Sequence, residues 1–242
     1  MKRIVKFLKD FLLFFPATYL FRPFSRMFLF ISYFNQLVVW ISRNKKLFLS
    51  SDHYSPVRDY NKRYQLYSFI TEHYQQPARE IVYLEFGVAG GTSFRWWMEH
   101  NQHAASRFFG FDTFEGLPEK WGNFYEKGDM SFAMPAISDP RGKFLKGLFQ
   151  DSLPGFIQEH QDLLNSGAQK VILMDADLYS ATIFTLSQLF PYLKKGDVIM
   201  FDEFNVAMHE FKAYTEFVNN FYIKLKPVVA VNNFYQVGFE VD

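Results

Sequence analysis

The 242 residues are enough for one large domain, or for one domain with an N-terminal extension. The 26 basic and 25 acidic side chains leave a formal net charge of +1, which argues against nucleic acid as the main partner, because phosphate binding usually needs a basic excess. The sequence contains no cysteine, which excludes disulfide bonds and thiolate metal sites.

The first 56 residues are rich in aromatic side chains, and we expect them to form a helical extension ahead of the main domain. Their longest apolar stretch, residues 27–41, is interrupted by Asn35 and Gln36 and is too short for a comfortable bilayer span. Lysine and arginine are interleaved with Phe, Leu and Trp through residues 1–50, as in an amphipathic helix that lies in a membrane interface. Packing of these helices on the domain, or on a second copy in a homo-oligomer, is an equally open interpretation.

No apolar run in this extension is followed by a small-residue cleavage site of the kind that ends a secretory signal. The lack of cysteine is consistent with a reducing compartment. We therefore expect a cytoplasmic protein, and contact with the inner membrane face through residues 1–50 is left open.

Residues 57–242 are expected to form one α/β domain, because strand and helix patterns alternate along them. The domain opens with a helix between residues 57 and 74, where aromatic and apolar side chains recur at three- and four-residue spacing. A short apolar strand follows at residues 81–86, and the next helical pattern covers residues 92–100. This alternation predicts a doubly wound, mostly parallel sheet.

The turn between that strand and that helix contains Gly87, Gly90 and Gly91. Such a turn lets a nucleotide approach the backbone at a helix N-terminus, although many structural turns also hold two glycines. The spacing differs from that of a dinucleotide site, and the strand ends in Glu85, which suits the ammonium group of S-adenosylmethionine. Glu85, Gly87 and Gly91 are therefore predicted to adjoin the amino-acid end of this methyl donor, and Thr92 and Ser93, which begin the next helix, are further candidates for the donor site.

The second strand of the domain ends at Asp112, 27 positions after Glu85. An acid at this strand end accepts hydrogen bonds from ribose hydroxyls in Rossmann-type sites, so Asp112 and the adjacent Thr113 are predicted to contact the donor. Residues 119–142 then form a long loop of the kind that acts as a lid or binds substrate. Acceptor choice is expected to depend on this loop and on the N-terminal helices.

A third strand is expected at residues 143–149, followed by a helix. Asp151 and Ser152 stand where they could cap that helix. Gln150 and Asp151 are also candidates for the adenine edge of the donor, since a polar group just after the third strand can reach it. Both roles stay open for Asp151.

The fourth and fifth strands both end in acids, because Asp175 and Asp177 follow residues 171–174, and Asp202 and Glu203 follow DVIMF. In an open parallel sheet this edge is the ligand crevice. Converging carboxylates repel one another unless a cation lies among them, so Asp175, Asp202 and Glu203 are predicted to bind Mg²⁺. The alternative is that Asp175 caps a turn and Glu203 pairs with a lysine.

A cation at this edge would hold an acceptor oxygen near the methyl carbon and lower the pKa of its hydroxyl, which gives Asp175 a catalytic role. The reaction also needs a base, and His209 and Asp177 are the two candidates. A lone histidine on the following helix is more often structural, so the sequence does not choose between them.

The final segment reads as two strands joined near Asn232 and Asn233, an asparagine pair suited to a turn. With the five earlier strands they complete a set of seven. The expected fold class is therefore α/β, with a Rossmann-like, doubly wound, mostly parallel seven-stranded sheet and an N-terminal helical extension.

Taken in order, five motifs resemble the macrocin O-methyltransferase (TylF/MycF-type) family of class I S-adenosylmethionine-dependent methyltransferases. The resemblance covers the chain from about Tyr83 to its C-terminus and leaves out the phenylalanine-rich extension. The motifs that carry it are YLEFGVAGGTS, FFGFDTFEGLPEKW, GLFQDSLP, DADLYSAT and GDVIMFDEF.

The resemblance implies a class I methyltransferase fold for residues 57–242, S-adenosylmethionine as donor and often Mg²⁺. It puts Glu85, Gly87, Gly91 and Ser93 at the methionine end of the donor and Asp112 at its ribose, and gives Asp175, Asp202 and Glu203 the metal positions. Metal-binding members of the family have two aspartates where this chain has Asp202 followed by Glu203. Because glutamate is one methylene longer than aspartate, its carboxylate would reach a different position, and this difference could alter metal binding.

These patterns together predict an O-methyltransferase that acts on a hydroxyl of a sugar or secondary metabolite with the help of Mg²⁺. Its partner would be a small-molecule or glycan acceptor. A Rossmann-like oxidoreductase is disfavoured by the glycine spacing. A membrane-associated nucleotide-binding protein that lacks the chemistry remains the alternative, because a fold does not guarantee an activity.

Overall fold

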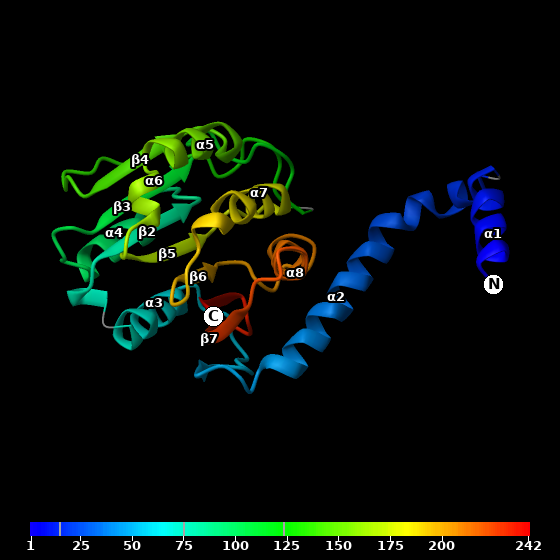
Figure 1. Ribbon diagram of the computed structural model, residues 1–242, viewed down its shortest axis with the longest axis horizontal. Coiled ribbons are helices and arrows are strands. Elements are labelled where there is room, and N and C mark those ends of the chain that lie inside the picture. The colour runs from blue at the N-terminus through cyan, green and yellow to red at the C-terminus, as the bar shows by residue number, and fades with distance from the viewer. Residues whose placement is uncertain (15, 75, 123) are drawn as a thin grey trace.

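The computed structural model describes residues 1–14, 16–74, 76–122 and 124–242. These residues form an α/β domain and an N-terminal arm that runs away from it (Figure 1). Two apolar cores, one on each face of the central sheet, hold the domain together. This arrangement confirms the predicted Rossmann-like architecture.

In the described part of the chain the sheet has eight strands, one more than predicted. The additional strand, β1, is only two residues long and pairs in parallel with β7 at the edge of the sheet. Only β8 runs antiparallel to its neighbours, as predicted for a terminal hairpin. In spatial order the strands are β1 (Ser50–Ser51), β7 (Leu225–Val231), β8 (Gln236–Val241), β6 (Val198–Phe201), β5 (Gln169–Met174), β2 (Ile81–Phe86), β3 (Arg107–Asp112) and β4 (Gly142–Lys146).

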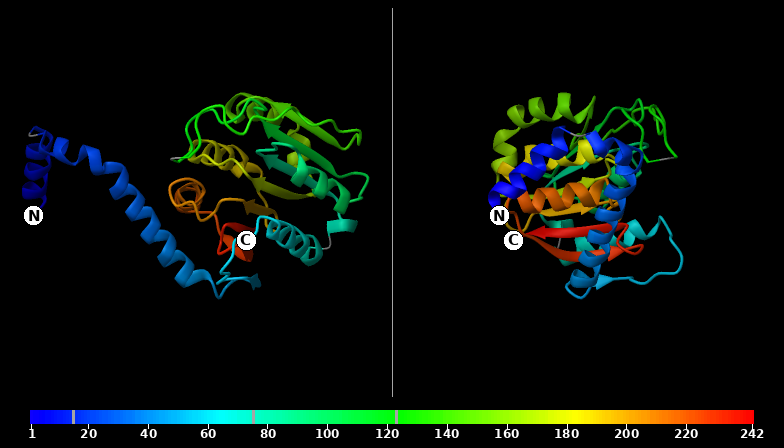
Figure 2. Two further views of the ribbon diagram at one scale, coloured as in Figure 1. Left: turned by 180° about the vertical axis from the view of Figure 1, so that it is seen from behind. Right: turned by 90° about the vertical axis from the view of Figure 1, so that its right-hand side faces the viewer.

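The central strands β2, β5 and β6 are buried along their whole length, which explains why their sequences are mostly apolar and do not alternate with polar residues. One face of the sheet is covered by α3 (Lys62–His73) and α4 (Thr92–His100). The other face is covered by α5 (Phe149–Glu159), α6 (Gln161–Asn165), α7 (Tyr179–Leu189) and α8 (Glu210–Asn220), as the views in Figure 2 show.

The third predicted strand ends earlier than expected. Gly147, with φ of +136°, stops β4 after Lys146, and α5 already begins at Phe149. The prediction that Asp151 and Ser152 cap this helix is therefore wrong, because both lie inside it. The Ser152 hydroxyl donates back to the carbonyl of Leu148 instead.

The N-terminal extension consists of α1 (Lys2–Phe14), a 3₁₀ segment η1 (Pro16–Phe24) and α2 (Ser25–Asn44). The last turns of α2 belong to the domain core, since Leu37 is 3% exposed and the Trp40 ring lies 4.9 Å from that of Phe204. Residues 1–36, which we call the N-terminal arm, extend beyond that contact.

Candidate functional site

A close approach between two strand ends shapes the centre of the site. β2 leads into Gly87, whose φ of +98° is rarely adopted by residues with a side chain. A Cβ atom at this position would overlap the backbone carbonyl of Asp175, which follows β5. Only glycine therefore lets the turn after β2 lie against the end of β5, and this contact brings the two predicted acidic strand ends to one edge.

Glu85 lies in β2, two residues before Gly87, and its side chain is buried, with only 1% of the residue exposed. The Tyr83 hydroxyl donates to its carboxylate at 2.6 Å. Burial raises the pKa of the Glu85 carboxyl to about 8, and the hydrogen bond from Tyr83 only partly opposes this. The free protein thus holds a carboxyl group that a cationic ligand group would ionise.

We expect the free energy of unfolding of the ligand-free protein to fall as the pH rises from about 5 to about 9. The pKa of Glu85 is raised in the folded state, so its contribution is fully present below about pH 4.5 and is lost as the pH rises through about 8. Urea unfolding at several pH values measures this slope. Glu85→Gln should have a shallower slope than the unchanged protein, and equal slopes would contradict the assignment.

Asp112, at the end of β3, organises the backbone of the neighbouring turn. Its Oδ2 atom accepts hydrogen bonds from the N–H groups of Val88 and Ala89, each at 2.8 Å, and its Oδ1 atom accepts one from Phe114 at 2.7 Å. A carboxylate has about four acceptor positions, so one remains for a ligand hydroxyl. Asp112 both fixes the glycine turn and faces the cavity described below.

Three carboxylates converge at the ends of β5 and β6. One oxygen each from Asp175, Asp177 and Glu203 lies within 4.8 Å of the other two. Among the described residues, the Oε2 atom of Glu203 is a buried oxygen without a hydrogen-bond partner. Burial raises the pKa of Asp177 to about 7 and holds those of Asp175 and Glu203 well above their usual range. We call these three residues the acidic trio.

Asp202, which the sequence predicts as a metal ligand, does not join the trio. Its carboxylate is fully buried and pairs with Arg63, with Nη2 and Oδ2 2.9 Å apart. The Nη1 atom of Arg63 also lies 3.7 Å from Oδ2 of Asp175. The guanidinium group of Arg63 thus balances part of the negative charge of these carboxylates. The sequence interpretation assigned this role to a metal ion alone.

Arg63 is the functional residue that sequence reasoning missed, although a signal was present. It stands four residues before Tyr67 and seven before Ile70, so helical spacing puts it on the face of α3 that those buried residues occupy. A basic residue in register with a buried face needs an acidic partner. That partner comes from β6, 139 residues later in the chain.

A cavity of about 350 Å³ opens at the carboxyl edge of the sheet. Three aromatic side chains, Tyr60, Trp121 and Tyr125, line the cavity, and the rings of Trp121 and Tyr125 are stacked with their centroids 5.0 Å apart. Flat aromatic faces of this kind pack well against the apolar faces of ligand rings. The predicted site residues that line the cavity are Gly87, Asp112, Thr113, Gln150, Asp175, Asp177 and Glu203.

The other predicted residues lie around the cavity rather than in its wall. Gly91 precedes α4 and contacts Pro135 of the long loop, while Thr92 is exposed and Ser93 buried in the first turn of that helix. Asp151 is exposed on α5. The ring of His209 accepts a long hydrogen bond of 3.4 Å from the backbone of Tyr179 at the start of α7, and burial lowers its pKa. The base role of His209 stays a prediction without a contact to support it.

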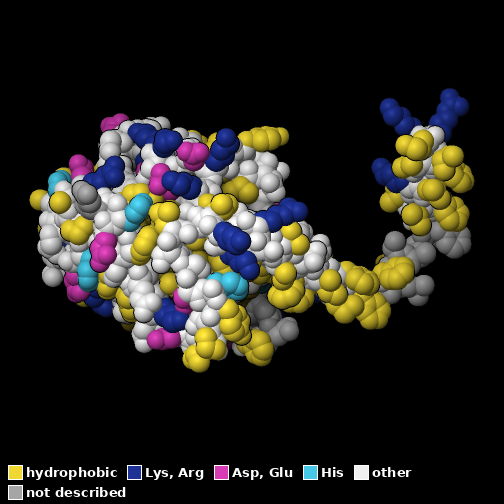
Figure 3. All heavy atoms as spheres, turned by 90° about the horizontal axis from the view of Figure 1, so that it is seen from below, with side chains coloured by type: hydrophobic (Ala, Val, Ile, Leu, Met, Phe, Trp, Pro, Cys, Tyr) yellow, Lys and Arg dark blue, Asp and Glu magenta, His cyan; other side chains and the backbone are white. Residues whose placement is uncertain are grey.

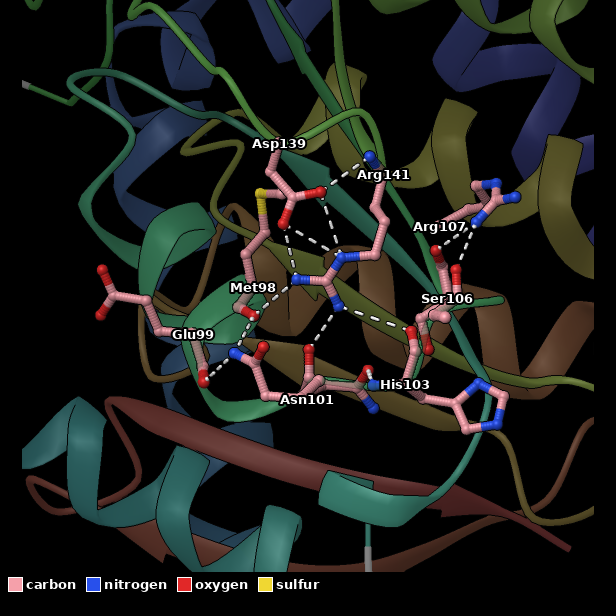
Figure 4. A network of polar contacts seen from close by, with 10 residues as sticks. Met98, Glu99, Asn101, His103, Ser106, Arg107, Asp139 and Arg141 are labelled. Carbon is pink, nitrogen blue, oxygen red and sulfur yellow. Dashed lines mark hydrogen bonds and ion pairs between the residues drawn. The ribbon is translucent and has the colours of Figure 1, made fainter.

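The long loop between β3 and β4 is fastened at its far end by Arg141 (Figure 4). This side chain pairs with Asp139 at 2.7 Å and donates to the carbonyl groups of Met98 and Asn101 at 3.1 and 2.6 Å. These contacts tie the end of the loop to the C-terminal end of α4. The loop therefore covers the glycine turn from a fixed anchor.

Comparison with known proteins identifies the family of the domain. The model of the methyltransferase domain family matches residues 84–204, half of the chain. A relative from Streptomyces olivaceus, 8-demethyl-8-(2,3-dimethoxy-alpha-L-rhamnosyl)-tetracenomycin-C 4'-O-methyltransferase, is 27% identical over a part that covers 53% of this chain and 57% of the relative. The chain thus spans little more than half the length of this curated relative.

Two solved structures share the fold. The calicheamicin methyltransferase CalS11 has a TM-score of 0.56 at 18% identity, over 87% of this chain and 91% of that one. The O-methyltransferase NovP has a TM-score of 0.52 at 16% identity, over 86% of this chain and 97% of that one. Both alignments extend well beyond residues 84–204, so the likeness in fold covers most of the domain.

Proposed function

The chain belongs to the methyltransferase domain family, and we propose that it is an S-adenosylmethionine-dependent O-methyltransferase of the macrocin O-methyltransferase type. Its acceptor would be a hydroxyl of a sugar or secondary metabolite. The observation that carries the proposal is that Asp112 and the acidic trio line the same cavity. The relative from Streptomyces olivaceus, named as a 4'-O-methyltransferase of a rhamnosyl compound, supports a sugar-bearing acceptor.

The donor would lie across the ends of β2 and β3. Glu85 would pair with the ammonium group of the methionine end, Asp112 would accept a hydrogen bond from the ribose, and Gln150 would face the adenine edge. Gly87 lines the cavity, so the donor tail would pass along its backbone. This placement directs the sulfonium methyl group toward the acidic trio.

The donor set of the trio fits a hard divalent cation such as Mg²⁺, since it offers three carboxylate oxygens within 4.8 Å of one another. The Oε2 atom of Glu203 also has no hydrogen-bond partner among the described residues. Bound there, Mg²⁺ would lower the pKa of the acceptor hydroxyl and restrict its position. Asp177 takes the ligand role that the sequence interpretation gave to Asp202, whose carboxylate is held by Arg63.

The remaining tasks fall to side chains of this chain. Trp121 and Tyr125 would stack against the acceptor ring and exclude water from the cavity. The Asp177 oxygen that does not bind the cation would accept the proton of the hydroxyl that attacks the methyl carbon. Methyl transfer from a sulfonium is an in-line displacement, so correct positioning accounts for much of the rate.

Donor binding should release about one proton at pH 7, because the donor's ammonium group ionises a Glu85 carboxyl whose pKa is about 8. Calorimetric titration in two buffers with different ionisation enthalpies measures that proton. Glu85→Gln should bind the donor roughly 10- to 100-fold more weakly and release no proton. Glu99→Gln, an exposed residue of α4, is the matched control and should behave like the unchanged protein. No detectable donor binding by the unchanged protein would remove the proposed function.

Mg²⁺ should raise the melting temperature of the unchanged protein, and this effect should be absent in Asp177→Asn and Glu203→Gln. Each variant loses one ligand of the trio while keeping its volume nearly constant. Glu119→Gln is the control, because Glu119 accepts a hydrogen bond from Ser180 at the cavity edge but lies outside the trio. Equal stabilisation of all four proteins would contradict the metal site and leave donor binding untouched.

Donor binding combined with no methyl transfer to any hydroxyl in a broad panel of sugars and glycosides would favour the alternative function. The chain would then be a nucleotide-binding protein that kept the fold without the reaction. In such a protein the ion pairs of Arg63 with Asp175 and Asp202 would neutralise part of the acid cluster without a metal ion.

A further inference from the structure

The N-terminal arm carries a large apolar surface that the domain does not cover. Helix α1 has Lys2, Lys6 and Lys9 along one side, and exposed side chains such as Ile4 and Leu8 along the other. The first part of α2 is apolar around its whole circumference, with exposed side chains from Met27 through Phe34. Figure 3 shows this surface continuing along the arm. Monomeric soluble domains rarely expose apolar surface of this extent.

The charge of this region is opposite to that of the domain. Residues 1–51 contain nine lysines and arginines and a single acid, Asp10, whereas the rest of the chain has more acidic than basic residues. Apolar residues interleaved with basic ones are the composition of segments that lie in anionic membrane interfaces. The charge pattern therefore favours an anionic lipid surface over a second copy of the chain, which would bring two strongly basic arms together.

The length of the arm decides between lying in the interface and crossing the bilayer. Residues 21–44 form a helical stretch that is long and apolar enough to cross a membrane by length and composition, and an 18-residue window within it has a mean hydropathy of 1.3. This stretch is longer than the apolar residues 27–41 that the sequence indicates. However, the end of α2 is committed to the domain through Leu37 and Trp40. Residues 21–24 are 3₁₀-helical and residues 25–36 α-helical. Together they reach only about 26 Å, which is less than the roughly 30 Å of a hydrocarbon core.

The base of the arm is held firmly on the domain. The Tyr33 hydroxyl donates to Glu216 of α8 at 3.0 Å, and the same carboxylate accepts a hydrogen bond from Tyr179 at the start of α7. The Trp40 ring packs among aromatic rings of α8 and the final hairpin. These contacts set the direction in which α2 leaves the domain.

That direction puts the arm on the same side as the cavity. In Figures 1 and 2, α1 and the first part of α2 stand off the side of the domain where the long loop between β3 and β4 lies. This loop carries exposed apolar side chains of its own, namely Phe124, Phe132 and Met134. A surface that the arm contacts therefore lies on the side of the domain at which the cavity opens.

We infer that the N-terminal arm inserts into the interface of an anionic lipid bilayer without crossing it and holds the cavity rim toward that membrane. The lysines of α1 would face the headgroups, and the apolar sides of α1 and α2 would enter the acyl boundary. This attachment does not depend on the proposed methyl transfer.

Flotation of the full chain with preformed vesicles tests the inference. The protein should float with vesicles of mixed phosphatidylglycerol and phosphatidylcholine and much less with phosphatidylcholine alone. Replacing Lys2, Lys6 and Lys9 together by Glu should lower the partition into anionic vesicles by about 100-fold, since each basic residue near an anionic surface contributes about fivefold. Phe28→Asp combined with Ile31→Asp should reduce it at least tenfold in both lipid mixtures.

The matched control changes the same number of charges on the opposite edge of the sheet. Lys143, Lys195 and Lys226 stand near the amino ends of β4, β6 and β7, and their replacement by Glu should leave flotation unchanged. Equal flotation of the Lys2, Lys6 and Lys9 variant and of this control would overturn the inference. Self-association without flotation, abolished by Phe28→Asp and Ile31→Asp, would assign the surface to a second copy and overturn it as well.

Topology is testable because the chain has no cysteine of its own. With vesicle-bound protein, an impermeant maleimide added outside should label Lys2→Cys and Asp242→Cys at rates within a few-fold of each other. Labelling of Asp242→Cys alone, with Lys2→Cys protected until detergent is added, would show that the arm crosses the bilayer and would refute an interfacial position.

Discussion

Arg63→Met is expected to lower the free energy of unfolding by about 3–5 kcal/mol, as is typical when one partner of a buried ion pair is removed. The substitution would leave the fully buried carboxylate of Asp202 without its 2.9 Å partner. The Oδ1 atom of Asp202 already lacks a hydrogen bond within the described residues. Equilibrium urea unfolding, followed by circular dichroism, measures the loss.

The neighbouring residue provides the control for this prediction. Lys62 pairs with Asp52 at 2.6 Å, but both side chains are more than 20% exposed, so Lys62→Met should cost less than about 1 kcal/mol. Adding Asp202→Asn to Arg63→Met should restore part of the lost stability, because the buried charge is removed as well. Similar losses for Arg63→Met and Lys62→Met would show that the Arg63 pair is not buried in the way described.

The sequence predicted the central architecture well because its signals there are local. An apolar run at 81–86, a glycine turn and a helical period from residue 92 require no knowledge of distant contacts, and β2 and α4 have these bounds in the structure. The convergence of Asp112, Asp175 and Glu203 on one edge follows from parallel pairing of their strands.

The sequence could not show which side chains pair with one another when they come from distant parts of the chain. Asp202 and Glu203 are adjacent, so they point in different directions as β6 ends, and only the structure shows that Arg63 takes the first and the acidic trio the second. The same holds for the docking of α2. The aromatic pattern of α2 is present in the sequence, but apart from Phe48 the rings around Trp40 come from segments more than 160 residues away, such as Phe204 and Phe239.

Gly87→Ala is expected to lower the free energy of unfolding by more than about 4 kcal/mol, a loss that marks a specific structural conflict rather than an ordinary substitution. Two effects add. The φ of +98° is unfavourable for any residue with a Cβ atom, and that atom would overlap the carbonyl of Asp175. Backbone cannot move aside as a flexible side chain can, so the ends of β2 and β5 would have to separate.

Gly196→Ala distinguishes these two effects, because Gly196 has a similar φ of +89° but nothing within 4 Å of the added atom. Its loss should be limited to the backbone term of about 1–2 kcal/mol. The difference between the two variants in urea unfolding then measures the overlap with Asp175 alone. If the added Cβ atom does overlap Asp175, Gly87→Ala must also displace Asp175 from Asp177 and weaken the stabilisation of the protein by Mg²⁺. Gly196→Ala must leave that stabilisation intact. Equal losses in both variants would mean that the β2 turn does not lie against β5, and the acidic trio would lose the contact that brings Asp175 to the cavity.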